Sequence, residues 1–218
     1  MIRHDLEQAL LEMKLKLSQE GLQALDLFAC ELKKWNRKFN LTAIRTDSDI
    51  AVKHMVDSLV FASSVHAGEY VMDIGSGAGF PSIPLKIMNP DVRVMSVDAV
   101  GKKILFQKHI SRLLALDGFE ALHARVESLH GSHAGYFDAI CSRAFSRLDE
   151  FVALAAPMLK KDGRLIAMKG PDVHAEIASI QDGLRRLGFE INSLQDYSLP
   201  MNKGERCLVT ISSTKAHR

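Results

Sequence analysis

The stretch Tyr70-Val71-Met72-Asp73-Ile74-Gly75-Ser76-Gly77-Ala78-Gly79-Phe80-Pro81 decides the fold of this chain. Its first five residues are apolar apart from Asp73, as in a buried strand, and they lead into three closely spaced glycines. Pro81 and Pro84 suit the first turn of a following helix, where a missing N–H costs little. A strand, a glycine-rich turn and a helix in this order bring a nucleotide-like cofactor against bare backbone N–H groups.

The spacing of the glycines indicates which cofactor the turn fits. A dinucleotide fingerprint is G-x-G-x-x-G, whereas Gly75, Gly77 and Gly79 form G-x-G-x-G and Phe80 occupies the third glycine position. No Lys-Ser or Lys-Thr pair follows, which disfavours a P-loop. The carboxylate of Asp73 would repel a pyrophosphate and suits a cation, such as the methionine ammonium of S-adenosylmethionine. The turn therefore favours S-adenosylmethionine and counts against a nucleotide-dependent oxidoreductase.

A second acidic residue strengthens this interpretation. The expected strand 92–97 ends at Asp98, which lies about 20 residues beyond the glycines, where a carboxylate grips ribose hydroxyls. Such a charged hydrogen bond is worth about 1.5–3 kcal/mol. The alternative is that Asp73 and Asp98 only cap helices.

From Gly68 onward, strands and helices are expected to alternate. Strands are expected at 70–74, 92–97, 119–124, 137–141, 164–168, 189–196 and 206–212, and helices at 82–88, 101–116, 148–160 and 173–187. A helical stretch after each strand except the last two predicts an α/β fold with a parallel sheet, closed by an antiparallel hairpin. Ligands of such sheets bind at the carboxyl ends of the strands. The side chains expected to converge there are Asp73, Asp98, Val126, Glu127, Arg143 and Lys169.

The first 66 residues are expected to form a helical extension, and residues 67–218 the α/β domain. Apolar residues recur with helical period at Leu6, Leu10, Met13 and Leu17, and again at Leu22, Leu25, Phe28 and Leu32. A third helix is expected to begin after Asp47 or Ser48, with Val52, Met55, Val56 and Leu59 buried.

Composition sets the class of protein. The 218 residues are 47% hydrophobic and 25% charged, which is typical of a globular chain. The formal net charge of +2 neither demands nor excludes nucleic acid. Cys30, Cys141 and Cys207 are scattered, and we see no signal peptide or apolar run of the ~18 residues that span a bilayer. We therefore expect a reduced, cytoplasmic protein without a structural zinc.

Charge is concentrated in one interval of the extension. Six cations face only Asp47 and Asp49 there: Lys33, Lys34, Arg37, Lys38, Arg45 and Lys53. This pattern fits a basic patch for nucleic acid and equally a solvated helix face.

An ordered set of motifs then identifies a family. The motifs are Asn40-Leu41-Thr42, Lys53-His54-Met55-Val56-Asp57-Ser58, the glycine loop 73–81, Gly101-Lys102-Lys103, Arg125-Val126-Glu127, Ser142-Arg143-Ala144, Lys169-Gly170 and Gly204-Glu205-Arg206. Nearly the whole chain resembles the small-subunit (16S) ribosomal RNA guanine-N7 methyltransferases, the glucose-inhibited division protein B or ribosomal small subunit methyltransferase G family. Two residues depart from the family pattern: Ser82, where glycine is usual, is expected to crowd the helix start slightly, and Lys53 stands where arginine is common.

The resemblance implies a class I S-adenosylmethionine-dependent methyltransferase fold, Rossmann-like with a mostly parallel seven-stranded sheet. It also implies methyl transfer to N7 of one guanine in the decoding region of 16S rRNA. Together with the residue analysis, it gives a cofactor site of Asp73, Gly75, Gly77, Gly79, Phe80, Asp98, Val126, Glu127 and Arg143. RNA contacts are expected from Lys53, His54, Lys102, Lys103, Lys169 and Arg206.

The chemistry of the implied methyl acceptor, guanine N7, determines which catalytic groups the site needs. Guanine N7 carries a free lone pair and no proton, so its methylation needs alignment but no general base or metal. Arg143 and Lys169 are therefore expected to position the substrate, the alternative for both being surface salt bridges. Exocyclic-amine methyltransferases carry an Asn/Asp-Pro-Pro-aromatic loop where this chain reads Ser142-Arg143-Ala144-Phe145. Cys141 lacks the flanking proline of a pyrimidine-C5 nucleophile and is interpreted as a core residue.

Other interpretations remain open from sequence. His54 and Asp57 are expected to hydrogen-bond to each other, or to bond to other buried polar groups where the third helix packs on the rest of the chain. His130 and His133 have no third ligand in view, so no metal site is expected. A small-molecule methyltransferase and a noncatalytic ribosome-assembly factor that binds S-adenosylmethionine are the alternative functions.

Overall fold

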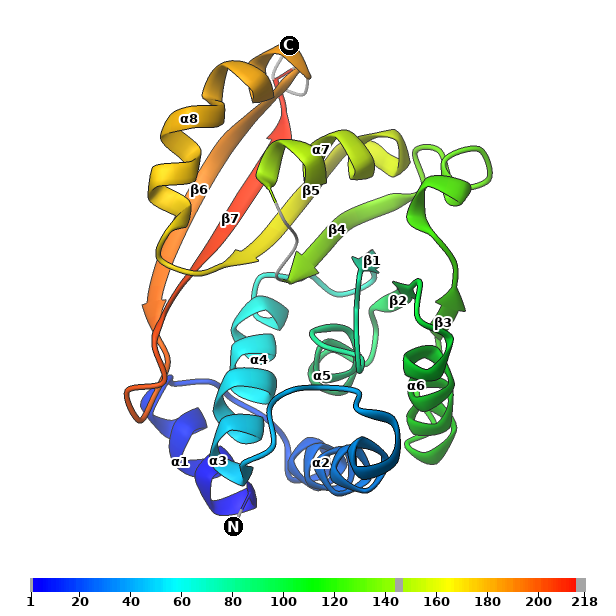
Figure 1. Cartoon of the computed structure of the whole chain (residues 1–218), viewed down its shortest axis with the longest axis vertical. Helices are drawn as coiled ribbons and strands as arrows, with labels where there is room; N and C mark the ends of the chain where they lie inside the picture. The colour runs from blue at the N-terminus through cyan, green and yellow to red at the C-terminus, as the bar shows by residue number, and fades with distance from the viewer. Residues whose placement is uncertain (1, 144–146, 215–218) are drawn as a thin grey trace.

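The computed structural model describes residues 2–143 and 147–214. Its seven strands form one sheet in the order β3-β2-β1-β4-β5-β7-β6 (Figure 1). The strands are β1 Tyr70–Ile74, β2 Arg93–Asp98, β3 Phe119–His123, β4 Phe137–Arg143, β5 Leu159–Lys169, β6 Phe189–Ser198 and β7 Glu205–Ser213. The first five pair in parallel, whereas β7 runs antiparallel to both β5 and β6. The α/β prediction with a closing hairpin is confirmed.

Helical segments precede and connect the strands. The α-helices are α1 Ile2–Glu12, α2 Gln19–Phe39, α3 Asp47–Asp49, α4 Asp57–Ala62, α5 Ser82–Met88, α6 Gly101–Leu113, α7 Leu148–Ala155 and α8 Val173–Arg186. A π-helix, η1 Ile50–Val56, joins α3 to α4, and short 3₁₀ turns occupy η2 Val126–Leu129 and η3 Ala156–Met158. No helix in the described ranges is long and apolar enough to cross a membrane.

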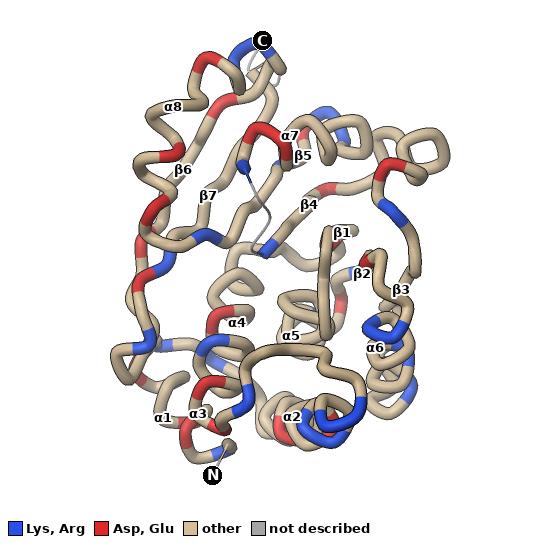
Figure 2. The backbone as a smooth tube through the Cα atoms, in the orientation of Figure 1, with Lys and Arg blue, Asp and Glu red and all other residues tan. Residues whose placement is uncertain are grey.

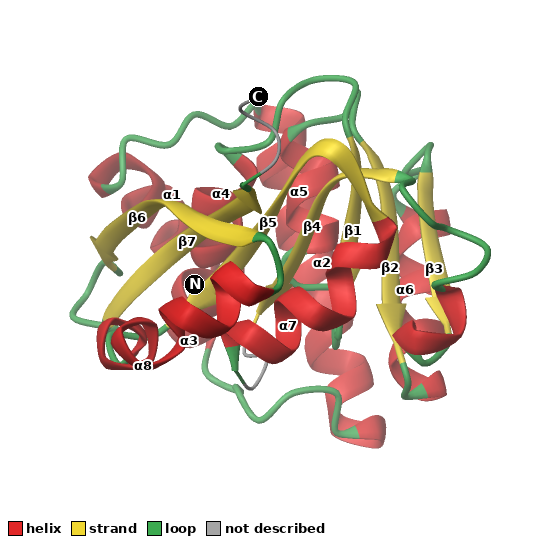
Figure 3. Cartoon of the chain, turned by 90° about the horizontal axis from the view of Figure 1, so that it is seen from above, coloured by secondary structure: helices red, strands yellow, loops and turns green. Residues whose placement is uncertain are grey.

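The sheet lies between two helical layers (Figure 3). Because side chains alternate along a strand, Met72 of β1 packs with α7 and α8, whereas its neighbour Val71 packs with Phe61 of α4 and Leu85 of α5. A third apolar cluster joins α1, α2 and η1 to Phe80 and to α6. The extension thus packs against the glycine loop, and the boundary between residues 66 and 67 stays a prediction.

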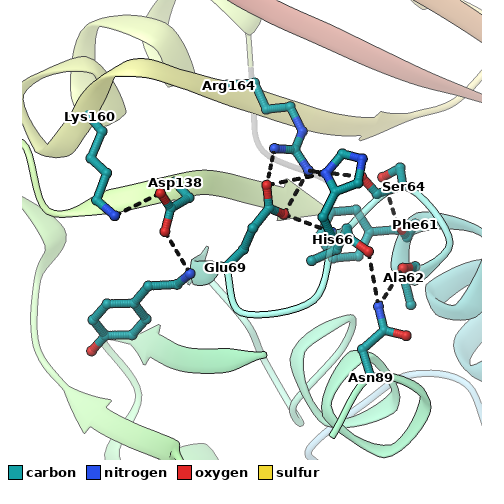
Figure 4. Close-up of polar contacts among 11 residues, drawn as sticks. Phe61, Ala62, Ser64, His66, Glu69, Asn89, Asp138, Lys160 and Arg164 are labelled. Carbon is teal, nitrogen blue, oxygen red and sulfur yellow. Dashed lines mark hydrogen bonds and ion pairs between the residues drawn. The ribbon is translucent and has the colours of Figure 1, made fainter. Parts of the chain in front are cut away.

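At the amino end of β1, an ion-pair cluster ties the segment after α4 to the sheet (Figure 4). Arg164 of β5 donates to both carboxylate oxygens of Glu69, at 2.6 and 2.8 Å, and to the Ser64 carbonyl at 2.8 Å. Burial alone would raise the pKa of Glu69, but hydrogen bonds from Arg164 and the His66 amide outweigh it and lower this pKa to about 2. The cluster is therefore charged at neutral pH and lies at the end of the sheet opposite to the glycine loop.

Several predicted boundaries were wrong. The first helix ends at Glu12 instead of reaching Leu17, because Lys14 takes a left-handed φ of 55°. Ser18 then begins a new helix by accepting a hydrogen bond from the Gly21 amide. The helix expected over 148–160 ends at Ala155, since Pro157 cannot continue it. Strand β5 consequently begins earlier than predicted, and only the η2 turn follows β3. The helix 101–116 ends at Leu113, shortly before Ala115 adopts a φ of 47°.

Candidate functional site

The glycine loop leaves its backbone open where a ligand can approach. Gly75, Gly77 and Gly79 have φ values of 71°, 60° and 92°, a region that favours glycine. A Cβ added at Gly75 or Gly77 would meet no atom within 4 Å. At Gly79 it would lie 2.4 Å from Cδ1 of Ile83, on α5. The first two glycines therefore expose the backbone, whereas the third allows α5 to pack closely.

Asp73 offers this loop an unpaired carboxylate oxygen. The residue is 1% exposed, and its Oδ2 accepts a hydrogen bond from the Ser82 amide at 3.2 Å. Its Oδ1 is buried without a hydrogen-bond partner among the described residues. Burial raises the pKa of Asp73 to about 7. An orphaned buried oxygen beside an open backbone fits the ammonium group of an S-adenosylmethionine-type ligand.

Asp98 braces the loop from the neighbouring strand. Its Oδ2 accepts from the Gly77 amide and its Oδ1 from the Val100 amide, both at 2.8 Å, and Lys103 lies 3.7 Å away. Asp98 thus holds the start of α6, as the capping alternative supposed. A carboxylate has about four lone-pair sites, so these contacts leave room for ribose hydroxyls, and that role stays a prediction.

Gln107 is a positioning residue that sequence reasoning missed. Its Nε2 donates to the Ser76 hydroxyl at 2.8 Å and to the Gly77 carbonyl at 2.9 Å. The hydroxyls of Ser82 and Ser96 continue the network: they lie 3.0 Å apart, and Ser96 donates to Gln107 Oε1 at 2.6 Å. Ser82 therefore belongs to a buried network behind the loop, a role that the sequence did not indicate.

Arg143 lies at the centre of the site. Its side chain, 19% exposed, donates through Nη1 to the Lys53 carbonyl at 3.1 Å and through Nη2 to Nδ1 of His54 at 3.0 Å. Its guanidinium carbon is 5.2 Å from the Phe80 ring centre. Burial lowers the pKa of Arg143, and the carboxylates of Asp57 and Asp73 oppose this effect. Arg143 thus connects the extension to the end of β4.

His54 is a neutral imidazole in this arrangement. Burial and the charge of Arg143 lower the pKa of His54 to about 3. Since Nδ1 accepts from Arg143, Nε2 carries the proton and donates to the Thr42 hydroxyl at 2.9 Å. The ring stacks on Phe80, with centres 4.3 Å apart and planes 9° apart. The stack fixes the extension against the glycine loop.

Asp57 is not bonded to His54 as one interpretation expected. Its Oδ1 instead accepts from the Tyr197 hydroxyl at 2.8 Å, and its Oδ2 lies 3.8 Å from Arg143. Burial raises the pKa of Asp57, whereas Arg143, Tyr197 and Arg206 lower it. His54 is thus bonded to Thr42 and Asp57 to Tyr197, while Arg143 contacts both His54 and Asp57. Tyr197, on β6, was missed because nothing in its sequence neighbourhood indicates this contact.

A cleft of about 510 Å³ opens beside Arg143, and we call it the strand-end cleft. It brings together many of the predicted substrate contacts; its lining includes Lys53, His54, Asp57, Arg143, Lys169 and Arg206. Lys53 pairs with Asp49 at 3.2 Å, Lys169 with Glu176 at 2.8 Å, and Arg206 lies 3.9 Å from Asp57. The salt-bridge alternative thus describes Lys169 in part, and its role toward RNA stays a prediction.

Other predicted residues lie outside this cleft. Lys102 and Lys103 occupy the first turn of α6 instead of the strand-end cleft, and Lys103 lies 3.7 Å from Asp98. Val126 is buried and Glu127 exposed in the η2 turn, which follows β3 at the same sheet edge as Asp98. Ala144 and Phe145 lie outside the described residues.

Two cysteines bear on the alternatives of a pyrimidine-C5 nucleophile and of a metal site: Cys141 and Cys207. Cys141 is fully buried in β4, as predicted, and burial with the nearby Asp73 carboxylate raises its pKa well above the usual range. His174, Asp196 and Cys207 place potential metal-ligand atoms within 4.8 Å of one another. His174 Nε2 and Asp196 Oδ1 are hydrogen-bonded there at 2.9 Å, and burial raises the pKa of Cys207 to about 12. A protonated thiol is a poor metal ligand, and the expectation of no metal stays a prediction.

Comparisons with known proteins agree with this arrangement. A family model described as rRNA small subunit methyltransferase G matches residues 21–204. A ribosomal RNA small subunit methyltransferase G from Geobacter sp. (strain M21) is 49% identical over 206 residues, 94% of this chain and 95% of the relative. One from Geotalea uraniireducens (strain Rf4) is 50% identical over 200 residues, 92% and 91% of the two chains.

A solved structure supports the fold independently. The crystal structure of a SAM-dependent methyltransferase from Aquifex aeolicus aligns with a TM-score of 0.56 at 16% identity. The alignment covers 75% of this chain and 92% of that protein. The predicted class I sheet is therefore confirmed at the level of the fold.

Proposed function

Because the chain belongs to the rRNA small subunit methyltransferase G family, we propose that it methylates N7 of one guanine in the decoding region of 16S rRNA. Methylation of small-subunit ribosomal RNA follows from the family, and S-adenosylmethionine is the methyl donor. The acceptor atom and the decoding region are our proposal. The observation that carries it is the strand-end cleft. It is large enough for a nucleobase, is lined among the described residues by four cationic and three acidic side chains, and adjoins the glycine loop through Arg143 and Phe80.

The cofactor would be held by residues on both sides of the loop. Asp73 would receive the ammonium group on its unpaired Oδ1, and the open backbone of Gly75 and Gly77 would lie against the ligand. Asp98 would bind the ribose, and Val126 with Glu127 would complete the site. The bound group supplies an electrophilic methyl on a sulfonium.

The buried ionisable groups of the strand-end cleft suit an acceptor that loses no proton. Both ring nitrogens of His54 are engaged, and its pKa of about 3 keeps it neutral at physiological pH. Asp57 is held by Tyr197 and by the charge of Arg143. These groups therefore act by positioning, which can supply about 7–11 kcal/mol of a barrier.

Arg143 is the residue we propose to orient the guanine. A guanidinium that lines the cleft can donate to the O6 edge of guanine. Its fixed partners, the Lys53 carbonyl and His54 Nδ1, limit its motion. A positive charge near N7 would also disfavour protonation of that nitrogen. Lys169 and Arg206 would hold the flanking phosphates.

A methyl-transfer assay with separate candidate substrates tests the substrate class. The protein is incubated with methyl-labelled S-adenosylmethionine and, separately, with unmodified small ribosomal subunits, their deproteinised RNA, large subunits and a metabolite extract. We expect label only on the small-subunit samples. Label on a metabolite would favour the small-molecule methyltransferase, and cofactor binding without any transfer would favour the assembly factor. Since the proposed substrate is ribosomal, we expect the protein to act in the cytoplasm.

A further inference from the structure

A second cleft, of about 280 Å³, lies on the extension, and we call it the extension cleft. It lies between the second half of α2 and the segment that follows it. Its lining includes Asn36, Arg37, Asn40, Ile44, Arg45 and Ile50. None of the roles assigned above uses it.

The wall of the extension cleft is held in place by hydrogen bonds between side chains and the backbone. Asn40 ends α2 in the left-handed conformation, with a φ of 48°. The side-chain Nδ2 of Asn36 donates to the Thr42 carbonyl at 3.0 Å, and its Oδ1 accepts from the Thr42 backbone amide at 2.9 Å. The Thr42 hydroxyl accepts from the Ile44 amide at 3.1 Å. The cleft is thus a built feature of the segment 40–45.

The charge of the extension cleft is uncompensated at two positions. Arg37 and Arg45 are both exposed, and neither pairs with a carboxylate within residues 2–143 and 147–214. Lys33, in contrast, pairs with Asp47. Figure 2 shows basic positions along α2 and on the loop beside it. Two unpaired guanidinium groups next to the partly exposed apolar side chain of Ile44 match the phosphate and base of a single-stranded nucleotide.

The two clefts share a wall. Ile44 lines both the extension cleft and the strand-end cleft. The Thr42 hydroxyl, which holds Ile44, is also the acceptor of His54 Nε2, and His54 in turn contacts Arg143. The two clefts therefore adjoin at Ile44, and a strand with one base in the strand-end cleft has the extension cleft beside it.

We propose that the extension cleft binds the RNA backbone next to the target guanosine, with Arg37 and Arg45 on phosphate oxygens. This inference rests on the proposed function, because it supposes that the target base enters the strand-end cleft. It assigns the RNA-facing part of the extension to the end of α2 and the segment 40–45. The six-cation interval predicted from sequence contributes two phosphate ligands, Arg37 and Arg45, to this site.

The test is a charge-reversal variant, Arg37→Glu with Arg45→Glu, measured beside a matched control. The control is Arg185→Glu with Arg186→Glu, which changes the net charge equally at the end of α8, far from α2 (Figure 1). Binding of both variants to unmodified small-subunit RNA is titrated over a range of salt. S-adenosylmethionine binding is measured by calorimetry, and thermal unfolding verifies the fold.

We expect the cleft variant to bind this RNA at least tenfold more weakly than wild type, with cofactor affinity unchanged. Its slope of log K against log salt should be shallower by about 1.4, since each phosphate contact on single-stranded RNA contributes ~0.7. The control should stay within about threefold of wild type, because a lost non-contact charge changes only long-range attraction. The KM for RNA should rise in the cleft variant more than kcat falls.

Two negative outcomes differ in meaning. If wild type methylates the RNA but both variants lose equal affinity, the extension cleft is not the binding site and the proposed function stands. If wild type neither binds nor methylates the RNA, either deproteinised or within unmodified small subunits, the proposed function fails and this inference fails with it.

Discussion

Asp73 should make cofactor binding depend on pH in a way that reports its unpaired oxygen. Without ligand its pKa is about 7, raised by burial from 3.8. A ligand ammonium at Oδ1 favours the ionised carboxylate, so binding below pH 7 must release a proton. At pH 6 only about one-tenth of Asp73 is ionised, and affinity should be about tenfold weaker than at pH 8, or ~1.4 kcal/mol.

Calorimetry with two ligands separates the pH dependence caused by Asp73 from a general loss of binding at acid pH. S-adenosylhomocysteine carries the ammonium and should show the tenfold change between pH 8 and pH 6, with nearly one proton taken up by the buffer at pH 6. Methylthioadenosine lacks the amino acid moiety and should bind with nearly constant affinity. A flat profile for S-adenosylhomocysteine, or equal slopes for both ligands, would refute the reasoning.

The variant Asp73→Asn adds a check on stability. Because the pKa of Asp73 is raised on folding, its ionisation destabilises the free protein as pH rises from about 4 to about 7. The asparagine variant should therefore unfold at a higher temperature than wild type at pH 8 without ligand. It should also bind S-adenosylhomocysteine about 10- to 100-fold more weakly, the equivalent of a charged hydrogen bond of ~1.5–3 kcal/mol, and without pH dependence.

Four further substitutions, at three residues, test the supporting contacts. Arg143→Ala should abolish methylation and destabilise the fold by about 3–5 kcal/mol in denaturant melts, because it removes one of the two cations beside the buried Asp57 carboxylate and leaves only Arg206, at 3.9 Å; Arg143→Lys should recover stability but not turnover. Tyr197→Phe should cost about 1–3 kcal/mol by the same melts, since Asp57 loses a buried donor, and no change would contradict that role. Glu69→Gln should cost about 1.5–3 kcal/mol at pH 7 through its contacts to Arg164. Since the pKa of Glu69 is lowered from 4.5 to about 2, this difference should persist above pH 4.5 and vanish as pH falls toward 2; a constant difference would argue against the ion pair.

The fold and the cofactor loop could be predicted because local chemistry specifies them. The run 70–81 needs only a buried strand, glycines with positive φ and a helix start, and all three are readable from neighbouring residues. Gln107 had a usable signal as well. It lies three residues after Ile104 and three before Ile110 on α6, so it is a polar residue on an apolar face.

The strand-end cleft was only partly predictable because its contacts join distant segments. Arg143 meets the Lys53 carbonyl across 90 residues, and Tyr197 meets Asp57 across 140. The π-helix that presents His54 has no sequence signature comparable to a glycine loop. Residue type and position along a strand predicted which side chains reach this sheet edge, but not which of them pair.

The central claim is tested most directly by locating the methyl group. Small ribosomal subunits lacking base methylation are incubated with the protein and labelled S-adenosylmethionine, and the RNA is cleaved chemically at 7-methylguanine. We predict one labelled cleavage site, at a guanine in the decoding region, which disappears with Arg143→Lys. Label that resists this cleavage, or that maps to another nucleotide, would contradict the account.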